Sequence, residues 1–367
     1  MLHRIAMMRN RGGFLNLVFL DPGGNPFAFL QGVDGVWHPT KAEAPGPTQI
    51  PAQTTFSAVL GVDFFGLLAL DQKGSLWSTT QDAEGNWNPN GFSLLPNALL
   101  PNGQALSFAD FGACQVAGFP VLVAAGGSGP APNVYAQVGV LAQGGLTQPA
   151  PIGGEYLSKG SVAAIGIDPN GVSTAVVVGS STLAGWPPFW CFTSVDGVNW
   201  LAAGTPQETP FGVNLAALVS GNPNGTLQAI LLQNGTPYLI WDASGNGSNW
   251  VLFQNQNNGQ LPNPDGRQFS MMAAARGNGG NLQVVGISNG LPYLIWQGAG
   301  GDWSPYANPQ GQGMQLPDAN PMNALLDLAM GTGNQGFLQV GYIGQDGSIY
   351  VNWQDQDGNW GWYGPLP

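Results

Sequence analysis

Residues 337–367 read FLQVGYIGQDGSIYVNWQDQDGNWGWYGPLP, and this stretch contains the unit from which the chain is built. Two apolar runs meet at Asp346-Gly347, and a third run begins at Trp360, just after Asp357-Gly358. Asp-Gly between two apolar runs is a strong hairpin signal, because a type I′ turn requires positive φ at both central residues. The stretch therefore predicts a β-hairpin, then a short turn and a further strand.

The same pattern recurs upstream, as TLQAILLQNGTPYLIW at 226–241, NLQVVGISNGLPYLIW at 281–296 and GLLALDQKGSLW at 66–77. Seven copies of about 52 residues fill the 367-residue chain, and this is the length of a four-stranded propeller blade. We therefore predict an all-β fold, a seven-bladed β-propeller with four antiparallel strands per blade, as a single domain over residues 1–367. The predicted blades cover approximately residues 1–50, 51–103, 104–157, 158–211, 212–265, 266–321 and 322–367.

A large aromatic residue marks the start of the fourth strand in most copies. The simplest role for such a series is packing between blades, and its members are Trp37, Trp87, Trp200, Trp250, Trp303 and Trp360. The first copy begins near residue 1, and the seventh ends with its own fourth strand. We therefore expect the ring to close by packing of the seventh blade against the first, without a swapped strand.

Composition narrows the classes of partner. The chain has 57 Gly and 30 Pro, but 43% of its residues are hydrophobic and only 8% are charged, which favours a folded protein with many turns. Its net charge is −12, with eight Lys and Arg, so nucleic acid and anionic membranes are not expected partners. No apolar run approaches the roughly 20 residues of a membrane helix, and the N-terminus does not resemble a secretion signal. We expect a protein that is cytoplasmic or released without a recognisable signal peptide.

Catalysis and metal binding have little support in the sequence. His3 and His38 are the only histidines, which argues against His-based triads and metal sites, so no cofactor, metal or catalytic residue is predicted. Cys114 and Cys191 lie in apolar strands and are expected to be buried free thiols. Most carboxylates are explained by turns, since an Asp precedes Gly at positions 34, 196, 265, 346 and 357.

Three other acidic residues leave an enzymatic alternative open. They lie in predicted first strands, which line the central channel of a propeller, and they are Asp63, Asp110 and Asp327. A pair of them within reach of one cleft would suit a hydrolase or lyase.

The end of the third strand carries the pattern most informative about function. Trp241, Trp296 and Trp353 stand there, each followed by a polar residue, namely Asp242, Gln297 and Gln354. Earlier copies place Leu30, Thr80, Val138 and Thr193 at the Trp position. A position that varies between copies in this way indicates a binding site that only some copies retain. An aromatic face beside a hydrogen-bonding side chain suits a sugar, whose C–H face stacks on the ring.

The order LQVxG, then xLYxxWQ, then GxW resembles the PLL-like seven-bladed bacterial lectins and, more loosely, tectonin-type propellers. The resemblance implies shallow pockets between neighbouring blades that hold fucose or O-methylated sugars. Applied to this sequence, the resemblance implies three sites. They are formed by Tyr238 with Trp241, by Tyr293 with Trp296, and by Tyr350 with Trp353. Trp250, Trp303 and Trp360 would close these sites.

The sequence thus favours a carbohydrate-binding lectin with several weak inter-blade sites and no enzymatic activity. Its expected partners are glycans or glycoconjugates, and a homo-oligomer is compatible with the sequence. The alternative is a protein-interaction scaffold that uses one face of the propeller, with the channel-carboxylate enzyme as a third reading. A large exposed apolar patch without pockets would favour the scaffold.

Overall fold

The strands of this protein are short and are separated by tight turns. A computed structural model describes residues 5–9, 14–20, 26–39, 55–60, 65–71, 73–81, 88, 92–95, 107–116, 119–126, 134–140, 145–146, 150–153, 162–167, 173–178, 189–196, 198–202, 213–220, 227–244, 249–253, 259–277, 279–298, 301–305, 315–317, 323–333 and 336–366. Within these ranges the chain forms β-strands and no helix, so the all-β class is confirmed. No described segment is a helix long and apolar enough to cross a membrane.

Consecutive strands pair antiparallel into separate sheets, numbered here in chain order. Sheet 1 consists of β1 (Ile5–Arg9), β2 (Leu15–Leu20), β3 (Pro26–Gln31) and β4 (Trp37–Pro39). Sheet 2 consists of β5 (Thr55–Leu60), β6 (Phe65–Leu70), β7 (Leu76–Gln81) and β8 (Ser93–Leu94). Sheet 3 consists of β9 (Phe108–Val116), β10 (Phe119–Gly126), β11 (Val134–Val140), β12 (Gly145–Leu146) and β13 (Ala150–Gly153).

The remaining sheets have four strands each in the described residues. Sheet 4 consists of β14 (Val162–Ile167), β15 (Ser173–Val178), β16 (Phe189–Ser194) and β17 (Leu201–Ala202). Sheet 5 consists of β18 (Val213–Ser220), β19 (Leu227–Gln233), β20 (Thr236–Asp242) and β21 (Trp250–Leu252). Sheet 6 consists of β22 (Met271–Arg276), β23 (Leu282–Ser288), β24 (Leu291–Gln297) and β25 (Trp303–Pro305). Sheet 7 consists of β26 (Leu325–Thr332), β27 (Leu338–Gly344), β28 (Ile349–Gln354) and β29 (Trp360–Tyr363).

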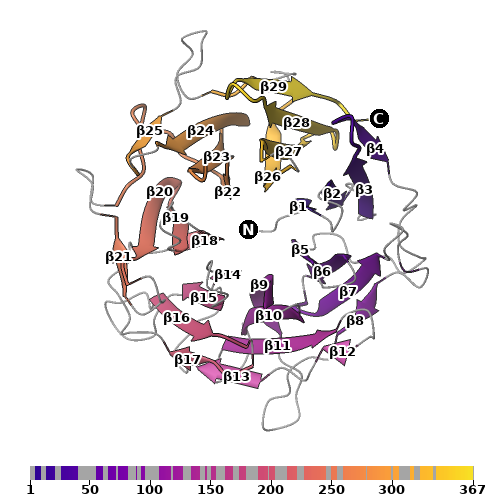
Figure 1. Ribbon diagram of the computed structural model, residues 1–367, viewed down its shortest axis with the longest axis vertical. Helices are drawn as coiled ribbons and strands as arrows, with labels where there is room; N and C mark the ends of the chain where they lie inside the picture. The colour runs from indigo at the N-terminus through magenta and orange to yellow at the C-terminus, as the bar shows by residue number, and fades with distance from the viewer. Residues whose placement is uncertain are drawn as a thin grey trace.

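The sheets stand side by side around a central axis (Figure 1). The first strand of each sheet is innermost, and these inner strands contact one another in a closed cycle: β1 with β5, then β9, β14, β18, β22 and β26, which returns to β1. Each sheet lies inside one of the seven sequence copies. Sheets 1 and 7 are both built from continuous chain, so the ring closes without a swapped strand, as expected.

Sheet 3 departs from the expected four strands. Its outer edge is split, because β12 pairs with Gly139 and Val140 of β11 whereas β13 pairs with Val134, Tyr135 and Ala136. Pro151 lies in β13 at this edge, where a residue without an N–H group interrupts no further ladder.

The Trp series matches the outer strands only in part. Trp37, Trp250, Trp303 and Trp360 begin β4, β21, β25 and β29, and Trp200 directly precedes β17. Trp87 lies outside the described residues, and in sheet 2 the outer strand is Ser93–Leu94, preceded by the buried Phe92.

Apolar side chains from neighbouring sheets fill the space between them. Leu17 and Phe29 of sheet 1, for example, pack with Ile349 and Val351 of sheet 7 in one buried cluster. The middle strand β27 is buried along its full length, as expected for a sheet covered on both faces. Sheet-to-sheet packing is therefore the core of the protein.

The predicted type I′ turn is wrong for Asp346-Gly347, whereas two Asn-Gly turns do adopt that type. Asn234 and Asn289 have φ of 45° and 50°, and the glycine after each also has positive φ, as in a type I′ turn. At Asp346-Gly347 only the glycine has positive φ, and the Gly347 N–H donates to the Gly344 carbonyl at 3.0 Å. This is a type I turn followed by a left-handed glycine, in which the Asp346 carboxylate can accept the Ser348 N–H at 2.8 Å.

The turn carboxylates predict acid sensitivity. The Ser348 N–H and other donors lower the pKa of Asp346 below its ordinary 3.8, so the ionised carboxylate stabilises the folded state, and this contribution is lost as pH falls below about 4. We expect Asp346→Asn to lower the melting temperature at pH 7, and the difference from wild type to shrink toward pH 3. A melting-temperature difference that is constant from pH 7 to 3 would contradict this.

The closure of the ring predicts a second effect on stability. Leu17 is 0% exposed and touches sheet 7, since a Cβ at Gly341 would lie 2.7 Å from its Cδ1. We expect Leu17→Ala to reduce the free energy of unfolding by about 2–5 kcal/mol, measured by urea denaturation. The matched control is Leu326→Ala, at a side chain that is 50% exposed, and it should change stability by no more than about 0.5 kcal/mol. If Leu17→Ala lowers the free energy of unfolding no more than Leu326→Ala does, the contact between sheets 7 and 1 contributes little to stability.

Candidate functional site

Strand alternation separates the aromatic residues that the resemblance placed together. Tyr350 and Trp353 are three residues apart in β28, so their side chains point to opposite faces of sheet 7. Tyr350 is buried in the cluster between sheets 6 and 7, and its hydroxyl accepts a hydrogen bond from Asn323 Nδ2 at 3.0 Å. Trp353 faces sheet 1 instead. The expected grouping of Tyr350 with Trp353 in one pocket is therefore not what the structure shows.

The other two Tyr residues occupy equivalent positions on their strands. Tyr293 is buried between sheets 5 and 6 and lies under Arg267, whose guanidinium carbon is 4.0 Å from the ring centre. Tyr238 packs against the cluster between sheets 4 and 5. All three predicted Tyr residues thus contribute to packing, on the face opposite the Trp that ends the same strand.

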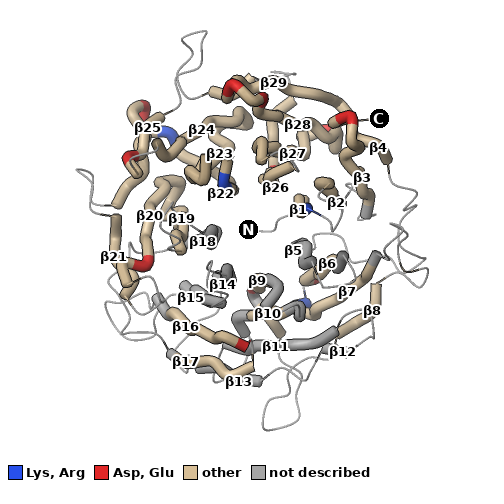
Figure 2. Tube along the Cα trace, in the orientation of Figure 1, with Lys and Arg blue, Asp and Glu red and all other residues tan. Residues whose placement is uncertain are grey.

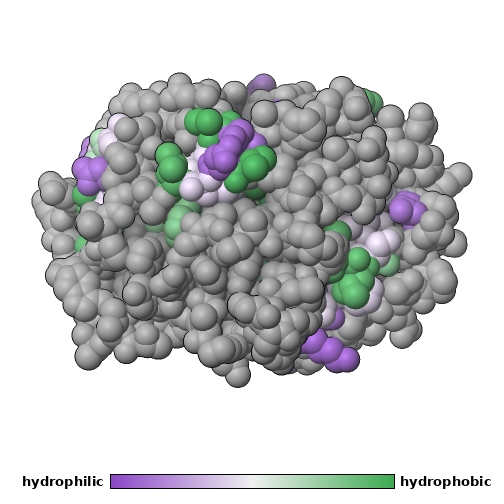
Figure 3. Space-filling model, turned by 90° about the horizontal axis from the view of Figure 1, so that it is seen from below, coloured by the Kyte–Doolittle hydropathy of each residue, from purple (hydrophilic) through white to green (hydrophobic). Residues whose placement is uncertain are grey.

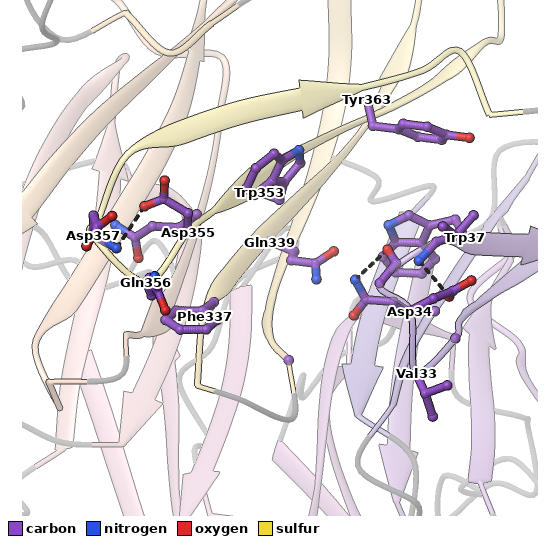
Figure 4. A pocket seen from close by; sticks show the side chains of 16 residues that line it. Val33, Asp34, Trp37, Phe337, Gln339, Trp353, Asp355, Gln356, Asp357 and Tyr363 are labelled. Carbon is purple, nitrogen blue, oxygen red and sulfur yellow. Dashed lines mark hydrogen bonds between the residues drawn. The ribbon is translucent and has the colours of Figure 1, made fainter.

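A pocket of about 560 Å³ lies between sheets 7 and 1 and is called pocket 7/1 here. Sheet 7 contributes Gln339 and Trp353, and sheet 1 contributes Gln31 and Trp37. Figure 4 shows Trp353 and Gln339 on one side of this space and Trp37 on the other, with Tyr363 at its edge. The pocket is built by two neighbouring sheets, neither of which forms it alone.

A second pocket of about 450 Å³, called pocket 6/7, lies one interface earlier in the ring. Sheet 6 contributes Gln283 and Trp296, and sheet 7 contributes Gln354 and Trp360. These are the same strand positions that supply Gln339, Trp353, Gln31 and Trp37 to pocket 7/1. The two pockets are therefore copies of one design.

Strand register explains why the design repeats. The Gln of the second strand lies directly opposite the Trp of the third, as in the pairs Gln339–Trp353, Gln283–Trp296 and Gln228–Trp241. The Gln that ends the third strand lies opposite the Trp that begins the fourth, as in the pairs Gln31–Trp37, Gln354–Trp360 and Gln297–Trp303. Each pocket combines one pair of the first kind with one pair of the second kind from the next sheet.

The same register places a third set between sheets 5 and 6. Gln228 and Trp241 come from sheet 5, and Gln297 and Trp303 come from sheet 6. Trp303 packs against the cluster that includes Leu239 of sheet 5, which confirms that it faces that sheet. At the interface of sheets 4 and 5, Asp242 and Trp250 are present, but Thr193 replaces the Trp of the third strand.

The seven Trp residues of these interfaces differ in exposure, and Trp37 is among the buried ones at 4% exposed. Trp250 and Trp360 are buried, at 2% and 8% exposed, whereas Trp296 and Trp353 are each 41% exposed. Trp241 and Trp303 are intermediate. The fourth-strand Trp therefore belongs to the packing between sheets, and the third-strand Trp presents its indole toward the pocket.

Glycine positions one of these exposed rings. Gly361 lies directly opposite Trp353, and a Cβ at Gly361 would come within 2.7 Å of the indole carbons. The ring therefore lies against the backbone of β29, where a side chain would displace it.

The Gln residues that end the third strands are held by their own turns. Nε2 of Gln31, Gln297 and Gln354 donates to the carbonyl of the glycine four residues later, at 3.1, 3.3 and 3.4 Å. Asp242 has a corresponding role, because its Oδ1 accepts the N–H and hydroxyl of Ser244. Gln354 Oε1 also accepts a 3.4 Å hydrogen bond from Gln283 Nε2, which joins the two walls of pocket 6/7.

Acidic residues surround both pockets. Asp355 and Asp357 line pockets 7/1 and 6/7, Asp34 lines pocket 7/1, and Figure 2 shows acidic residues along the outer edge of the ring. Burial raises the pKa of Asp355, but hydrogen bonds from Asn359 and Asp357 outweigh this and lower it overall. The carboxylate is therefore ionised at neutral pH and is held in place as an acceptor.

The second-strand Gln residues are the part of the site that the sequence reasoning missed. Gln228, Gln283 and Gln339 each follow a Leu at the start of a strand whose interior is otherwise apolar. A repeated Leu-Gln in a strand buried on both faces is a signal that a polar side chain is required there. Gln31, Trp37 and Phe337 were also outside the predicted set.

The two channel carboxylates that the structure describes, Asp110 and Asp327, do not lie together. Asp110 lies on β9 and Asp327 on β26, which stand on opposite sides of the ring in Figure 1. Oδ1 of each accepts the N–H of the following residue, at 2.9 and 2.8 Å. Asp63 lies outside the described residues, and among those described no group of acidic, His and Cys side chains is arranged to hold a metal ion.

No protein-family model matches this chain, and no curated protein matches it. Solved structures do. The BP39L lectin from Burkholderia pseudomallei is 18% identical, with a TM-score of 0.70 over 100% of this chain and 98% of that one. The Aleuria aurantia lectin, described as a six-bladed β-propeller with a novel fucose recognition mode, is 13% identical, with a TM-score of 0.54 over 100% and 96%. The SapL1 lectin in complex with alpha methyl fucoside is 13% identical, with a TM-score of 0.51 over 99% and 94%.

At these identities the likeness concerns the fold. The ring of sheets in Figure 1 is the architecture of β-propellers, and the matches extend over nearly the full length of both chains. This protein therefore has a β-propeller fold that it shares with structurally characterised lectins.

Proposed function

We propose that this protein is a non-enzymatic lectin, a seven-bladed β-propeller that binds sugars between neighbouring blades. The seven sheets of the described residues would be the blades, with the split outer edge of sheet 3 as a local variation. The observation that carries the proposal is the repetition of one four-residue set, two Gln and two Trp, in pockets at successive interfaces.

The chemistry of the set suits a pyranose ring. An indole that is 41% exposed offers a flat apolar face for the C–H side of a sugar. Amide and carboxylate groups at the pocket walls can exchange hydrogen bonds with hydroxyls, which donate and accept equally well. The pockets lie between the third and fourth strands of neighbouring sheets and include exposed residues such as Trp296 and Trp353.

Fucose is the first ligand to test. Two structures of the same fold are described as recognising fucose or binding alpha methyl fucoside, and the sequence resembles lectins of fucose and O-methylated sugars. The proposal for this chain covers monosaccharide-sized ligands of this kind and the glycans that display them.

Repetition supplies the affinity that one small site lacks. A pocket that holds one sugar is expected to bind with about −4 to −6 kcal/mol, which corresponds to millimolar or high micromolar dissociation constants. The three sets lie at consecutive interfaces, between sheets 5 and 6, 6 and 7, and 7 and 1. On a rigid ring, several such sites could raise the apparent affinity for a glycan-coated surface by roughly 10²–10⁴.

The scaffold and enzyme alternatives gain no comparable support. In Figure 3, which views the rim of the ring, the described hydrophobic residues occur in small groups beside hydrophilic ones. The enzyme would need two acidic side chains at one cleft, and Asp110 and Asp327 are on opposite sides of the ring.

The third-strand Trp residues provide the test. We expect Trp241→Ala, Trp296→Ala and Trp353→Ala, combined in one variant, to lower binding to a surface coated with alpha-linked fucose more than about tenfold, because each pocket loses its stacking face. Surface plasmon resonance would measure the binding, after a glycan array has identified the best-bound sugar.

Trp362→Ala is the matched control, because Trp362 is 40% exposed on β29 and lines neither pocket. It should bind as wild type does. Unchanged binding in the triple variant would refute the site, and a glycan array without any signal would refute the lectin function.

A further inference from the structure

Several buried polar atoms at the proposed sites have no hydrogen-bond partner in the described residues. They include the side-chain carbonyl Oε1 of Gln228, Gln283 and Gln339, together with the indole Nε1 of Trp303 and Trp360. Buried polar groups in folded proteins are nearly always paired, so such atoms need an explanation. Here the same atom is unpaired at the same strand position in three sheets, which argues against a chance packing defect.

Two of these atoms lie on facing walls of pocket 6/7. Gln283 and Trp360 both line the pocket, and each is 8% exposed. Gln283 Nε2 donates to Gln354 Oε1, and Trp360 lies directly opposite Gln354, so the three side chains share one interface. Gln283 is also directly opposite the exposed Trp296. An unpaired acceptor and an unpaired donor therefore belong to residues that line the same pocket as the exposed Trp296.

A hydroxyl group is the simplest ligand for this pair. It donates one hydrogen bond and accepts others, so a single hydroxyl can satisfy a carbonyl oxygen and an N–H at once. A methyl ether can accept from the indole but has no proton for the Gln carbonyl, and a deoxy position can do neither. The pair therefore distinguishes three substituents at one ring position of a sugar.

We propose that pocket 6/7 holds one free sugar hydroxyl between Gln283 Oε1 and Trp360 Nε1, and that this contact determines which sugars bind. The inference rests on the proposed lectin function and assigns the residues that select the ligand. The same pair recurs between sheets 5 and 6 as Gln228 Oε1 and Trp303 Nε1. These two sites share one specificity, which requires a free hydroxyl next to the face that stacks on Trp296 or Trp241.

The ligand side of the test changes the sugar and leaves every residue of pocket 6/7 unchanged. Methyl α-L-fucoside and its 2-, 3- and 4-deoxy and O-methyl derivatives would be titrated by calorimetry against a Trp241→Ala, Trp353→Ala background, in which only pocket 6/7 keeps its exposed Trp. We expect one ring position at which both the deoxy and the O-methyl derivative bind about tenfold or more weakly, with the deoxy derivative the weaker.

The protein side removes one partner at a time in the same background. Gln283→Met removes the acceptor and keeps a similar side-chain length, and Trp360→Phe removes the N–H and keeps an aromatic ring. Each substitution should raise the dissociation constant for methyl α-L-fucoside about tenfold, which is about 1.4 kcal/mol of binding free energy. The Gln283→Met substitution should change the affinity for the deoxy derivative at the selected position only slightly, because that derivative has no hydroxyl to donate to Gln283. Gln345→Met, at an exposed turn residue outside both pockets, is the control and should bind as the background does.

The outcomes separate the two levels of the proposal. If Trp296→Ala abolishes binding but Gln283→Met and Trp360→Phe do not weaken it, the hydroxyl contact is wrong and the lectin function stands. Equal affinity for all the deoxy and O-methyl derivatives would overturn the contact as well. If neither methyl α-L-fucoside nor the methyl glycosides of galactose, mannose, glucose and N-acetylglucosamine bind the wild type, the lectin function fails, and the inference fails with it.

Discussion

Face-to-face packing of neighbouring sheets is the constraint on which the rest of this structure depends. A four-stranded sheet with apolar residues on both faces, such as sheet 7, is stable only when another sheet covers each face. Arranging the sheets around an axis meets this requirement for every sheet at once, provided the last one packs on the first. The cluster that joins Leu17 of sheet 1 to Val351 of sheet 7 therefore completes the kind of core that the described residues also form between sheets 1 and 2, 4 and 5, 5 and 6, and 6 and 7.

The same packing creates the pockets. Neighbouring sheets contact each other through their inner strands, and at the interfaces of sheets 6 and 7 and of sheets 7 and 1 a pocket is left between the third and fourth strands. Side chains at the ends of the third and fourth strands line these pockets. In pocket 6/7 Trp360 is buried, whereas Trp296 is exposed. A binding site thus follows from the geometry of the ring wherever the outer positions carry the right side chains.

Much of the fold was accessible from the sequence, because local signals determine it. Glycine-rich turns, alternating apolar runs and a repeated Trp predicted the all-β class and the order of the strands within each copy. The grouping of site residues was harder to predict. Alternation along β28 already implies that Tyr350 and Trp353 face opposite ways, but which neighbour each one meets depends on how sheets follow one another around the ring. Gln339 and Gln31, more than 300 residues apart, meet in pocket 7/1 for this reason, and no local pattern indicates it.

The third-strand and fourth-strand Trp residues have different roles, and this explains why only some copies carry a Trp on the third strand. The fourth-strand Trp is buried in sheets 1, 5 and 7, as Trp37, Trp250 and Trp360, so its loss there would leave a cavity in the packing between sheets. The third-strand Trp is partly exposed, and its replacement costs the fold little. At the interface of sheets 4 and 5 the structural half of the set, Trp250 with Asp242, is present, while Thr193 stands where the exposed Trp would be. Under the proposed function, an interface such as that of sheets 4 and 5 can therefore lose its sugar site and keep its packing Trp.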